Sequence, residues 1–325
     1  MRRRAFLATL IAATARPGRA ATQPATKIPR VGYLFSFTPA SGRHYWEACR
    51  HGLRELGYVE ERTIRLEPRW ANERHEALPA LVADLLRAQV DVIVTAATPA
   101  SQAARAATRT VPIVMVAVAE PVRAGLVETL ARPGGNVTGL TLLTPELSGK
   151  RVELLVAVVG TLPRLAVLVN PGNFSHTVFL EETRTAAQAT GSTVHAVEAR
   201  TREELEAALA AAHARADALI VFDDPVLWSH RARVVDLAAR RRLPVMYGYR
   251  EFVDEGGLMS YGPSRPDLYR RTATYVDKIL RGARPAELPV ERPTRFELVV
   301  NLRAAAAIGV TMPPALLARA DAIIQ

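Results

Sequence analysis

The stretch LPALVADLLRAQVDVIVTAATP, residues 78–99, decides the fold. Its first part places apolar side chains at helical spacing: Leu78, Leu81, Val82, Leu85 and Leu86. The branched run 90–94 then predicts a buried strand, and Thr98-Pro99 predicts the start of another helix. A helix, a buried strand and a second helix in this order are typical of βα repeats on a parallel sheet.

The same alternation of apolar runs and amphipathic segments continues on both sides of this stretch. A first series of strands is expected near 30–35, 62–68, 90–95, 111–117 and 137–142. A second series is expected near 164–169, 192–198, 217–222 and 244–247, with helices in the gaps, the clearest over 202–215. Two such series predict an α/β fold with two doubly wound, Rossmann-like lobes.

The C-terminal part does not simply extend either series. A strand over 257–261 and a helix over 267–280 precede a proline-rich segment over 285–293. We interpret that segment as chain returning between the lobes, so that each lobe is discontinuous and the crossings form a hinge.

The N-terminus predicts export. A basic start at residues 1–4 precedes a short apolar stretch over 5–15, and Gly18-Arg19-Ala20 offers small residues for cleavage after Ala20. The stretch is shorter than the roughly 20 residues that a membrane span needs. Residues 3–7 carry the Arg-Arg-x-Phe-Leu pattern of a twin-arginine signal, and no cysteine follows for lipidation. We therefore expect residues 1–20 to be a signal peptide and the mature protein to be periplasmic.

The charge of the chain gives no indication of a nucleic-acid partner. The formal net charge of +10 includes five arginines of the expected signal peptide, which leaves +5 on the remainder. This excess is spread over arginine-rich helices, and we interpret it as a solvated surface.

A polar residue followed by proline occurs four times at the carboxyl end of an expected strand: Thr98-Pro99, Glu120-Pro121, Asn170-Pro171 and Asp224-Pro225. Proline suits the first helical position, and Thr, Asn or Asp suits the N-cap, whereas Glu is a poor N-cap. Each pair alone is explained equally well as a capped turn. Because ligands of open α/β sheets bind outside the carboxyl ends of the strands, the set predicts a binding cleft.

The residue types around this cleft favour a small carboxylate as ligand. Serine- and threonine-rich turns at helix N-termini suit an anion, and Glu120 or Asp224 is available to an ammonium group. Aromatic residues near the strand ends are available for stacking on a ligand, although packing between the lobes is the favoured explanation of each one alone: Phe37, Phe174, Tyr247, Tyr249 and Tyr261. A sugar is disfavoured because Trp46, Trp70 and Trp228 show no stacking arrangement. The candidate ligand-binding residues are Ser36, Phe37, Thr38, Thr98, Pro99, Ala100, Ser101, Glu120, Thr141, Asn170, Phe174, Asp224, Tyr247 and Tyr261.

Motifs of catalysis and cofactor binding are missing from the sequence. It contains no G-x-G-x-x-G, no complete phosphate-binding loop, no G-x-S-x-G and no H-E-x-x-H, and its seven histidines are scattered. Asp223 and Asp224 are adjacent on an expected strand, so only one of them is expected to face the cleft. We expect no enzyme, no cofactor and no metal. An exported hydrolase that uses Asp224 or Glu120 as a base is a less favoured alternative.

Six segments carry a resemblance to a known family: 52–58 (GLRELGY), 98–100 (TPA), 130–140 (LARPGGNVTGL), 147–151 (LSGKR), 247–252 (YGYREF) and 257–263 (GLMSYGP). Through them, nearly the whole mature chain resembles the ABC-transporter substrate-binding proteins that include tryptophan- and tyrosine-type importers. That family is built on the type I periplasmic-binding fold. Glu120 departs from it, because the family commonly has Asp before Pro-Val.

This resemblance implies a three-crossing hinge between lobe 1, residues 28–143 plus 256–282, and lobe 2, residues 144–255 plus 283–325. It also implies a monomer that captures a small solute, such as an amino acid or related carboxylate. The solute would pass to an ABC permease in the inner membrane, which works with its ATPase. The alternative is a clamp that signals its liganded state to a membrane receptor.

Overall fold

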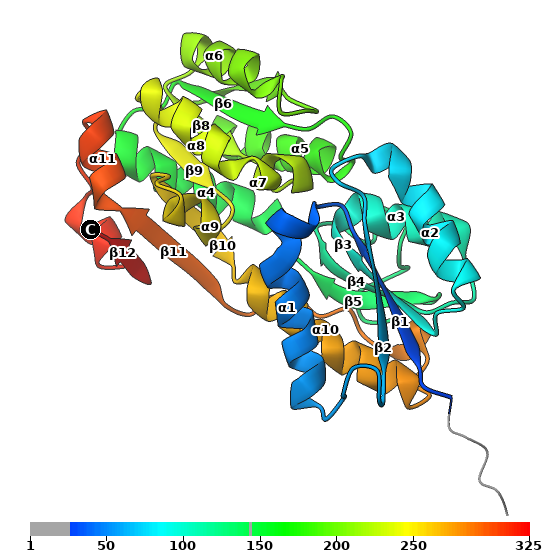
Figure 1. The fold of residues 1–325 in the computed structure, drawn as a ribbon. Helices are drawn as coiled ribbons and strands as arrows, with labels where there is room; N and C mark the ends of the chain where they lie inside the picture. The colour runs from blue at the N-terminus through cyan, green and yellow to red at the C-terminus, as the bar shows by residue number, and fades with distance from the viewer. Residues whose placement is uncertain (1–26, 143–144) are drawn as a thin grey trace, which may run out of the picture.

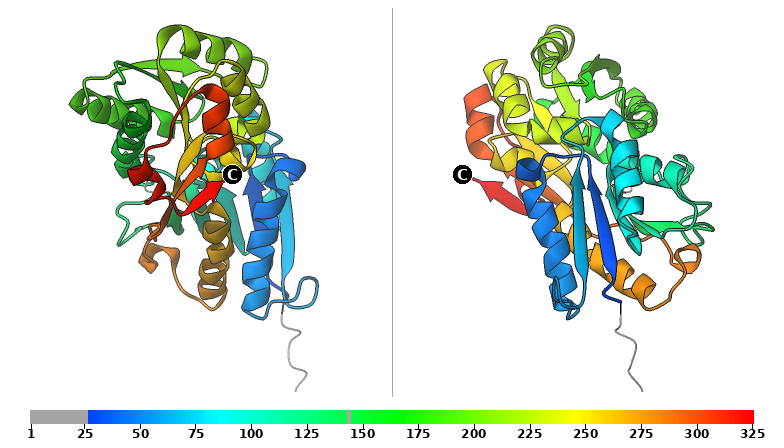
Figure 2. Two further views of the ribbon diagram at one scale, coloured as in Figure 1. Left: turned by 90° about the vertical axis from the view of Figure 1, so that its left-hand side faces the viewer. Right: turned by 45° about the vertical axis from the view of Figure 1, so that its right-hand side comes forward.

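The computed structural model describes residues 27–142 and 145–325, which form two sheets with helices on both faces of each (Figure 1). We call each sheet with its helices a lobe. The predicted signal peptide, residues 1–20, lies outside the described residues. Figure 2 shows the orange helix over residues 265–280 beside the blue helix over residues 39–55, so the first lobe is built from distant parts of the chain.

Lobe 1 contains a five-stranded sheet in the order β2-β1-β3-β4-β5, and every pairing is parallel. Strands β1, β3, β4 and β5 are almost fully buried, as expected for unbroken apolar runs covered on both faces. The strands are β1 (Arg30–Phe35), β2 (Arg65–Trp70), β3 (Val92–Ala96), β4 (Ile113–Val118) and β5 (Val137–Thr141).

Two pairs of helices cover the lobe 1 sheet. Helices α1 (Pro39–Glu55) and α10 (Arg265–Leu280) pack along each other on one face, and α2 (Leu78–Arg87) and α3 (Ala97–Ala107) lie on the other. Gly52 lets α1 and α10 approach closely, because a Cβ there would lie 2.1 Å from the carbonyl oxygen of Arg270.

Lobe 2 contains a seven-stranded sheet in the order β12-β11-β10-β9-β8-β6-β7. Its pairings are parallel except for the antiparallel pair β10–β11. The strands are β6 (Arg164–Val169), β7 (Thr193–Glu198), β8 (Ala218–Val221), β9 (Val245–Tyr247), β10 (Met259–Pro263), β11 (Phe296–Asn301) and β12 (Ala322–Ile324).

The helices of lobe 2 also lie on both faces of its sheet. The longer ones pack in two pairs, α4 with α5 and α6 with α8. The helices are α4 (Pro145–Val159), α5 (Ser175–Ala189), α6 (Leu205–Arg215), α7 (Pro225–Ser229), α8 (Arg231–Arg240), α9 (Arg250–Asp254), α11 (Leu302–Ile308) and α12 (Pro314–Leu317). The described residues also include two short 3-10 turns, His75–Ala77 and Pro285–Glu287.

The chain passes between the lobes at places that differ from the predicted boundaries. Strand β10 was assigned to lobe 1 within 256–282, but it pairs with β9 and β11 in the lobe 2 sheet. The chain returns to lobe 1 only with α10. Residues 283–291 then stay against lobe 1, where the amide of Val290 donates to the carbonyl of Leu130 (2.7 Å). An apolar strand fits either sheet by pattern alone, so the sequence did not reveal its partner.

The expected α/β fold with two lobes is confirmed, and most strands lie within a few residues of their predicted positions. The elements β11, α11, α12 and β12 after the proline-rich segment were not predicted. Among the described residues, no helix has both the length and the apolar character of a membrane span.

Candidate functional site

The two lobes touch along the carboxyl ends of their strands. Thr98 of lobe 1 and Ser175 of lobe 2 bring their hydroxyl oxygens within 2.7 Å of each other. The hydroxyl oxygens of Ser41 and Ser229 lie 3.1 Å apart in the same way. The polar turns expected to form a cleft therefore do face each other across the lobe interface.

The turn after β1 supplies three of the predicted residues. Ser36 is buried, and its hydroxyl has no hydrogen-bond partner. The ring of Phe37 packs on Trp228 of lobe 2, with centroids 5.2 Å apart. Thr38 caps α1 in a capping box, in which its hydroxyl accepts from the amide of Ser41 (3.1 Å). This turn therefore places a free buried hydroxyl beside an aromatic contact between the lobes.

The turn after β3 contains a strained residue that the sequence did not predict. Helix α3 begins at Ala97, whose φ of +69° lies in the left-handed region, and its N-cap is Ala96. Thr98 is therefore inside the first turn, and the predicted N-cap role for it is wrong. Pro99-Ala100 is buried in the same helix, while Ser101 donates to the carbonyl of Ala97 (2.9 Å). From this first turn of α3 the Thr98 hydroxyl reaches Ser175 of lobe 2.

Glu120 and Thr141 lie near the carboxyl ends of β4 and β5. The hydroxyl of Thr141 is buried and donates to the carbonyls of Val118 (2.7 Å) and Ala119 (2.9 Å). Glu120 is half-buried and precedes a turn rather than a helix. Thr141 thus ties the two strand ends together beside Glu120.

Lobe 2 contributes a buried network of two amides and one carboxylate. Asp224 caps α7, because its Oδ1 accepts from the amides of Val226 (2.8 Å) and Leu227 (3.2 Å). The side-chain amide of Asn170 donates to the same oxygen (3.1 Å), and that of Asn173 donates to Oδ2 (3.0 Å). The predicted cap at Asp224 is confirmed, and Asn173 is a member that the sequence did not reveal.

The turn after β6 is longer than predicted. Asn170 does not cap a helix, because α5 begins only at Ser175. The oxygen of its side chain instead accepts from the amide of Gly172 (2.9 Å). Phe174, a predicted stacking residue, is 42% exposed at the start of α5. Its ring is therefore not enclosed by the interface.

His176 holds the ends of β6 and β8 together. The amide of Asn170 donates to Nδ1 (2.7 Å), so Nδ1 carries no proton and Nε2 donates to the carbonyl of Asp223 (3.2 Å). Burial lowers the pKa of the imidazole below its ordinary value, more than the nearby carboxylate of Asp224 raises it. The folded protein therefore favours the neutral form of His176.

This buried neutral histidine makes stability depend on pH. Its folded pKa lies below its unfolded value of about 6.5, so its contribution is present above that pH and is lost on acidification. We expect the free energy of unfolding to fall between pH 7 and 5, with a contribution of at most about 1.4 kcal/mol per pH unit from this site. Urea titrations over this range should show a flatter dependence in His176→Gln. His51→Gln, at an exposed helix position, should keep the wild-type slope. Equal slopes in both variants would contradict the assignment.

Asp223 and Asp224 point to different partners, as their adjacency predicted. Asp223 Oδ2 lies 3.1 Å from Nη2 of Arg151, and both side chains are nearly inaccessible. Nε of Arg151 also donates to the carbonyl of Tyr261 (2.9 Å). This pair joins α4, the end of β8 and strand β10. The two aspartates therefore form no catalytic dyad.

Two predicted aromatic contacts lie outside the interface. Tyr247 stacks on Phe252 within the lobe 2 core, with centroids 4.7 Å apart. Tyr261 packs on Phe296 and contributes its carbonyl to Arg151. Both rings pack against rings of lobe 2, and among the described residues neither forms a ring contact with lobe 1.

The interface contains Phe37 and Tyr249, which the sequence predicted near the strand ends, and three rings that it did not single out as stacking residues, Tyr45, Trp228 and Tyr269. Tyr45 and Tyr269 from lobe 1 stack with centroids 4.3 Å apart. Trp228 of lobe 2 lies 5.0 Å from Tyr45, and Tyr249 faces the same guanidinium as these rings, that of Arg265. Helical spacing made Tyr45 and Tyr269 look like ordinary core residues. Tyr249 was predicted from its place just after the strand at 244–247.

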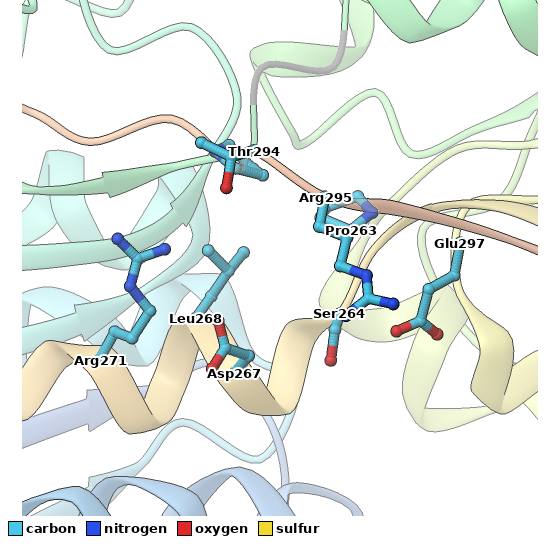
Figure 3. A pocket seen from close by; sticks show the side chains of 9 residues that line it. Pro263, Ser264, Asp267, Leu268, Arg271, Thr294, Arg295 and Glu297 are labelled. Carbon is cyan, nitrogen blue, oxygen red and sulfur yellow. The ribbon is translucent and has the colours of Figure 1, made fainter.

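A separate hollow of about 300 Å³ lies at the hinge (Figure 3). It sits between the start of α10 and the segment that leads into β11. None of the predicted site residues lines it, so we do not assign it to the cleft. Its lining consists of Pro263, Ser264, Asp267, Leu268, Arg271, Pro293, Thr294, Arg295 and Glu297. In the part of the chain that the structure describes, no cluster of side chains suits a metal ion.

The two lobes meet at the carboxyl ends of their strands, and hydroxyl, amide and aromatic side chains lie between them. This arrangement defines a solute-binding clamp of the type I periplasmic-binding fold. Residues 43–324 match the family model described as ABC transporter substrate binding protein. The chain is 25% identical over 250 residues to a tyrosine-binding protein of Clostridioides difficile, which covers 77% of this chain and 72% of the relative.

Two crystal structures resemble the chain over most of its length. An ABC domain in complex with L-Trp from Streptococcus pneumonia is 26% identical, with a TM-score of 0.85, covering 91% of this chain and 99% of that one. A conserved domain protein from Vibrio cholerae is 29% identical, with a TM-score of 0.87, covering 91% and 100%. The chain therefore belongs to the ABC transporter substrate-binding proteins. Its partners are a small-molecule solute and an ABC transporter.

Proposed function

We propose that the mature chain is a periplasmic monomer that captures a small carboxylate-bearing solute, of the amino-acid class, between its lobes. The observation that carries this proposal is the meeting of polar turns from both sheets, with the Thr98 and Ser175 hydroxyls 2.7 Å apart. Relatives that are named for tyrosine binding or crystallised with L-Trp support the amino-acid class. The loaded clamp would dock on a permease in the inner membrane, which works with its ATPase.

The proposed ligand residues are those predicted ones that the structure brings to the interface. In lobe 1 the turn at Ser36 and the start of α3 offer hydroxyl groups for a carboxylate. Glu120 at the end of β4 and Asp224 in lobe 2 are the acidic candidates for an ammonium group. Oδ2 of Asp224 accepts a single hydrogen bond, from Asn173, so it is able to accept another from the solute.

The proposal predicts binding without turnover. Native mass spectrometry of gently purified mature protein should show one chain with or without one small molecule. Thermal-shift measurements against amino acids, small carboxylates and sugars should then show stabilisation by about 2.7 kcal/mol at 100 times the dissociation constant. The solute should be recovered unchanged after release.

Small-angle scattering provides a second measurement, because closure about a hinge makes the particle more compact. Absence of both a thermal shift and a compaction across the panel would overturn the proposed function. Chemical conversion of a bound solute would overturn the assignment as a binding protein alone.

A further inference from the structure

Arg265 is a buried charge at the base of the lobe interface. It begins α10, directly after the chain crosses from β10 in lobe 2 to lobe 1. Arg265 is only 3% exposed, although the apolar pattern of buried positions does not call for an arginine there. A buried guanidinium needs compensation by charge or by hydrogen bonds, since the loss of its hydration costs several kcal/mol.

Aromatic rings from both lobes surround this guanidinium. Its Cζ lies 4.3 Å from the ring centre of Tyr249 in lobe 2 and 4.5 Å from that of Tyr45 in lobe 1. Phe37 and Trp228 follow at 5.5 Å each. All of these distances lie within the roughly 6 Å over which a cation is attracted to a ring face. The rings compensate the faces of the guanidinium, but they cannot accept its in-plane hydrogen bonds.

Two of the three guanidinium nitrogens of Arg265 are unsatisfied. Nε and Nη1 are buried and have no hydrogen-bond partner. Trp228 adds a further buried donor without a partner, its Nε1. Asp223, a carboxylate at the strand ends of lobe 2, uses its Oδ2 for Arg151. Neither its Oδ1 nor the Tyr269 hydroxyl forms a hydrogen bond with Nε or Nη1 of Arg265. A set of unpaired buried donors beside a positive charge is complementary to an anion.

Glu251 is the carboxylate that acts on Arg265 from a distance. Its Oε1 accepts from the hydroxyl of Tyr45 (3.0 Å) and lies 3.8 Å from Nε2 of His44. It forms no ion pair with the guanidinium. Glu251 therefore offsets part of the charge but leaves the hydrogen-bonding edge of Arg265 open.

We propose that Arg265 is the specificity-determining residue of the solute site and that it binds a second carboxylate, carried by the solute. This inference rests on the proposed function, in which a first carboxylate lies on the serine and threonine turns. The preferred solute is then an acidic amino acid or a related dicarboxylate. A planar carboxylate suits the guanidinium edge between the Tyr45 and Tyr249 rings better than a tetrahedral phosphate does.

Matched solutes that differ by one charge test this inference. Isothermal titration calorimetry of the mature protein with L-glutamate against L-glutamine, and with L-aspartate against L-asparagine, should show at least a tenfold preference for the acidic member. L-tyrosine and L-tryptophan serve as neutral aromatic solutes. Arg265→Gln should remove this preference and leave the affinity for the neutral members within about threefold, whereas Arg265→Lys should keep part of it.

Arg250→Gln is the control, because Arg250 is exposed next to the same turn and pairs with Asp254 at the surface. It should keep the wild-type preference. A wild-type protein that binds the neutral members as tightly as the acidic ones would overturn the inference while the proposed function stands. An equal loss of all solutes in Arg265→Gln would also overturn it, because Arg265 would then only hold the lobes together. No binding of any solute by wild type would overturn the proposed function as well.

Discussion

Replacement of Arg151 with methionine is expected to lower the free energy of unfolding by about 3–5 kcal/mol. The guanidinium is 2% exposed, pairs with Asp223 Oδ2 at 3.1 Å and donates to the carbonyl of Tyr261 at 2.9 Å. Methionine fills much of the same volume but leaves the Asp223 carboxylate buried without a counter-charge. Oδ1 of this carboxylate has no hydrogen-bond partner that would compensate the buried negative charge.

Urea denaturation of single and double variants measures this effect. Arg151→Met/Asp223→Asn removes the buried charge together with its partner, so it should be at least about 1 kcal/mol more stable than Arg151→Met alone. Lys150→Ala is the matched control, because Lys150 pairs with Glu153 at the surface and should cost less than about 1 kcal/mol. A loss below 1 kcal/mol in Arg151→Met would show that the ion pair does not stabilise lobe 2.

The pair also explains why the end of β9 needs glycine. A Cβ at Gly248 would lie 1.7 Å from Asp223 Oδ1 and 2.8 Å from Nη2 of Arg151. The carboxylate cannot move away without giving up its ion pair. The buried pair therefore fixes how closely β9 and β8 present their carboxyl ends to the interface.

Hydrophobic patterning predicted the sheets well because buried parallel strands need unbroken apolar runs. The run 90–94 became β3, and each later run of the same kind became a strand. The sequence predicted less well which strands pair with each other. The segment 257–261 carries the same pattern as any buried strand, and only the tertiary structure shows that β10 pairs with β9.

The sequence predicted where the residues of the candidate site lie better than it predicted what each residue does. All four polar residues before proline lie at the carboxyl ends of strands, but of them only Asp224 caps a helix. Asn170 fails as a cap because the chain continues to Ser175 before α5 begins. Where a helix starts depends on how the turn packs, and a dipeptide does not encode that.

The cluster around Arg265 shows what the sequence could not reveal. Its rings come from the β1–α1 turn, α1, α7, the β9–α9 turn and α10, which are far apart in the chain. The sequence placed Phe37 and Tyr249 near strand ends, but it gave no indication that Tyr45, Trp228 and Tyr269 join them. Only the closed arrangement of the lobes brings them around one guanidinium, so the charge selectivity of the cleft had no local signature.

Asp224→Ala is expected to lower the free energy of unfolding by about 2–4 kcal/mol and to abolish measurable solute binding. The carboxylate caps α7 and accepts the buried amides of Asn170 and Asn173. Alanine removes the cap and leaves both amides without acceptors. The lobe 2 side of the interface then loses the group that orders it.

Asp224→Asn separates the structural part of this effect from the part that involves solute. Asparagine keeps the cap through its oxygen, but its NH2 group faces the NH2 group of Asn173, so we expect a loss of about 1–2 kcal/mol. Affinity should fall by 10-fold to 100-fold if Oδ2 also pairs with the ammonium group of the solute, as proposed. Asp217→Asn, at a half-buried partner of Arg164 at the amino ends of the strands, should leave the affinity unchanged. Unchanged affinity in Asp224→Asn would limit Asp224 to its cap, and Glu120 would then be the remaining acidic group for the ammonium.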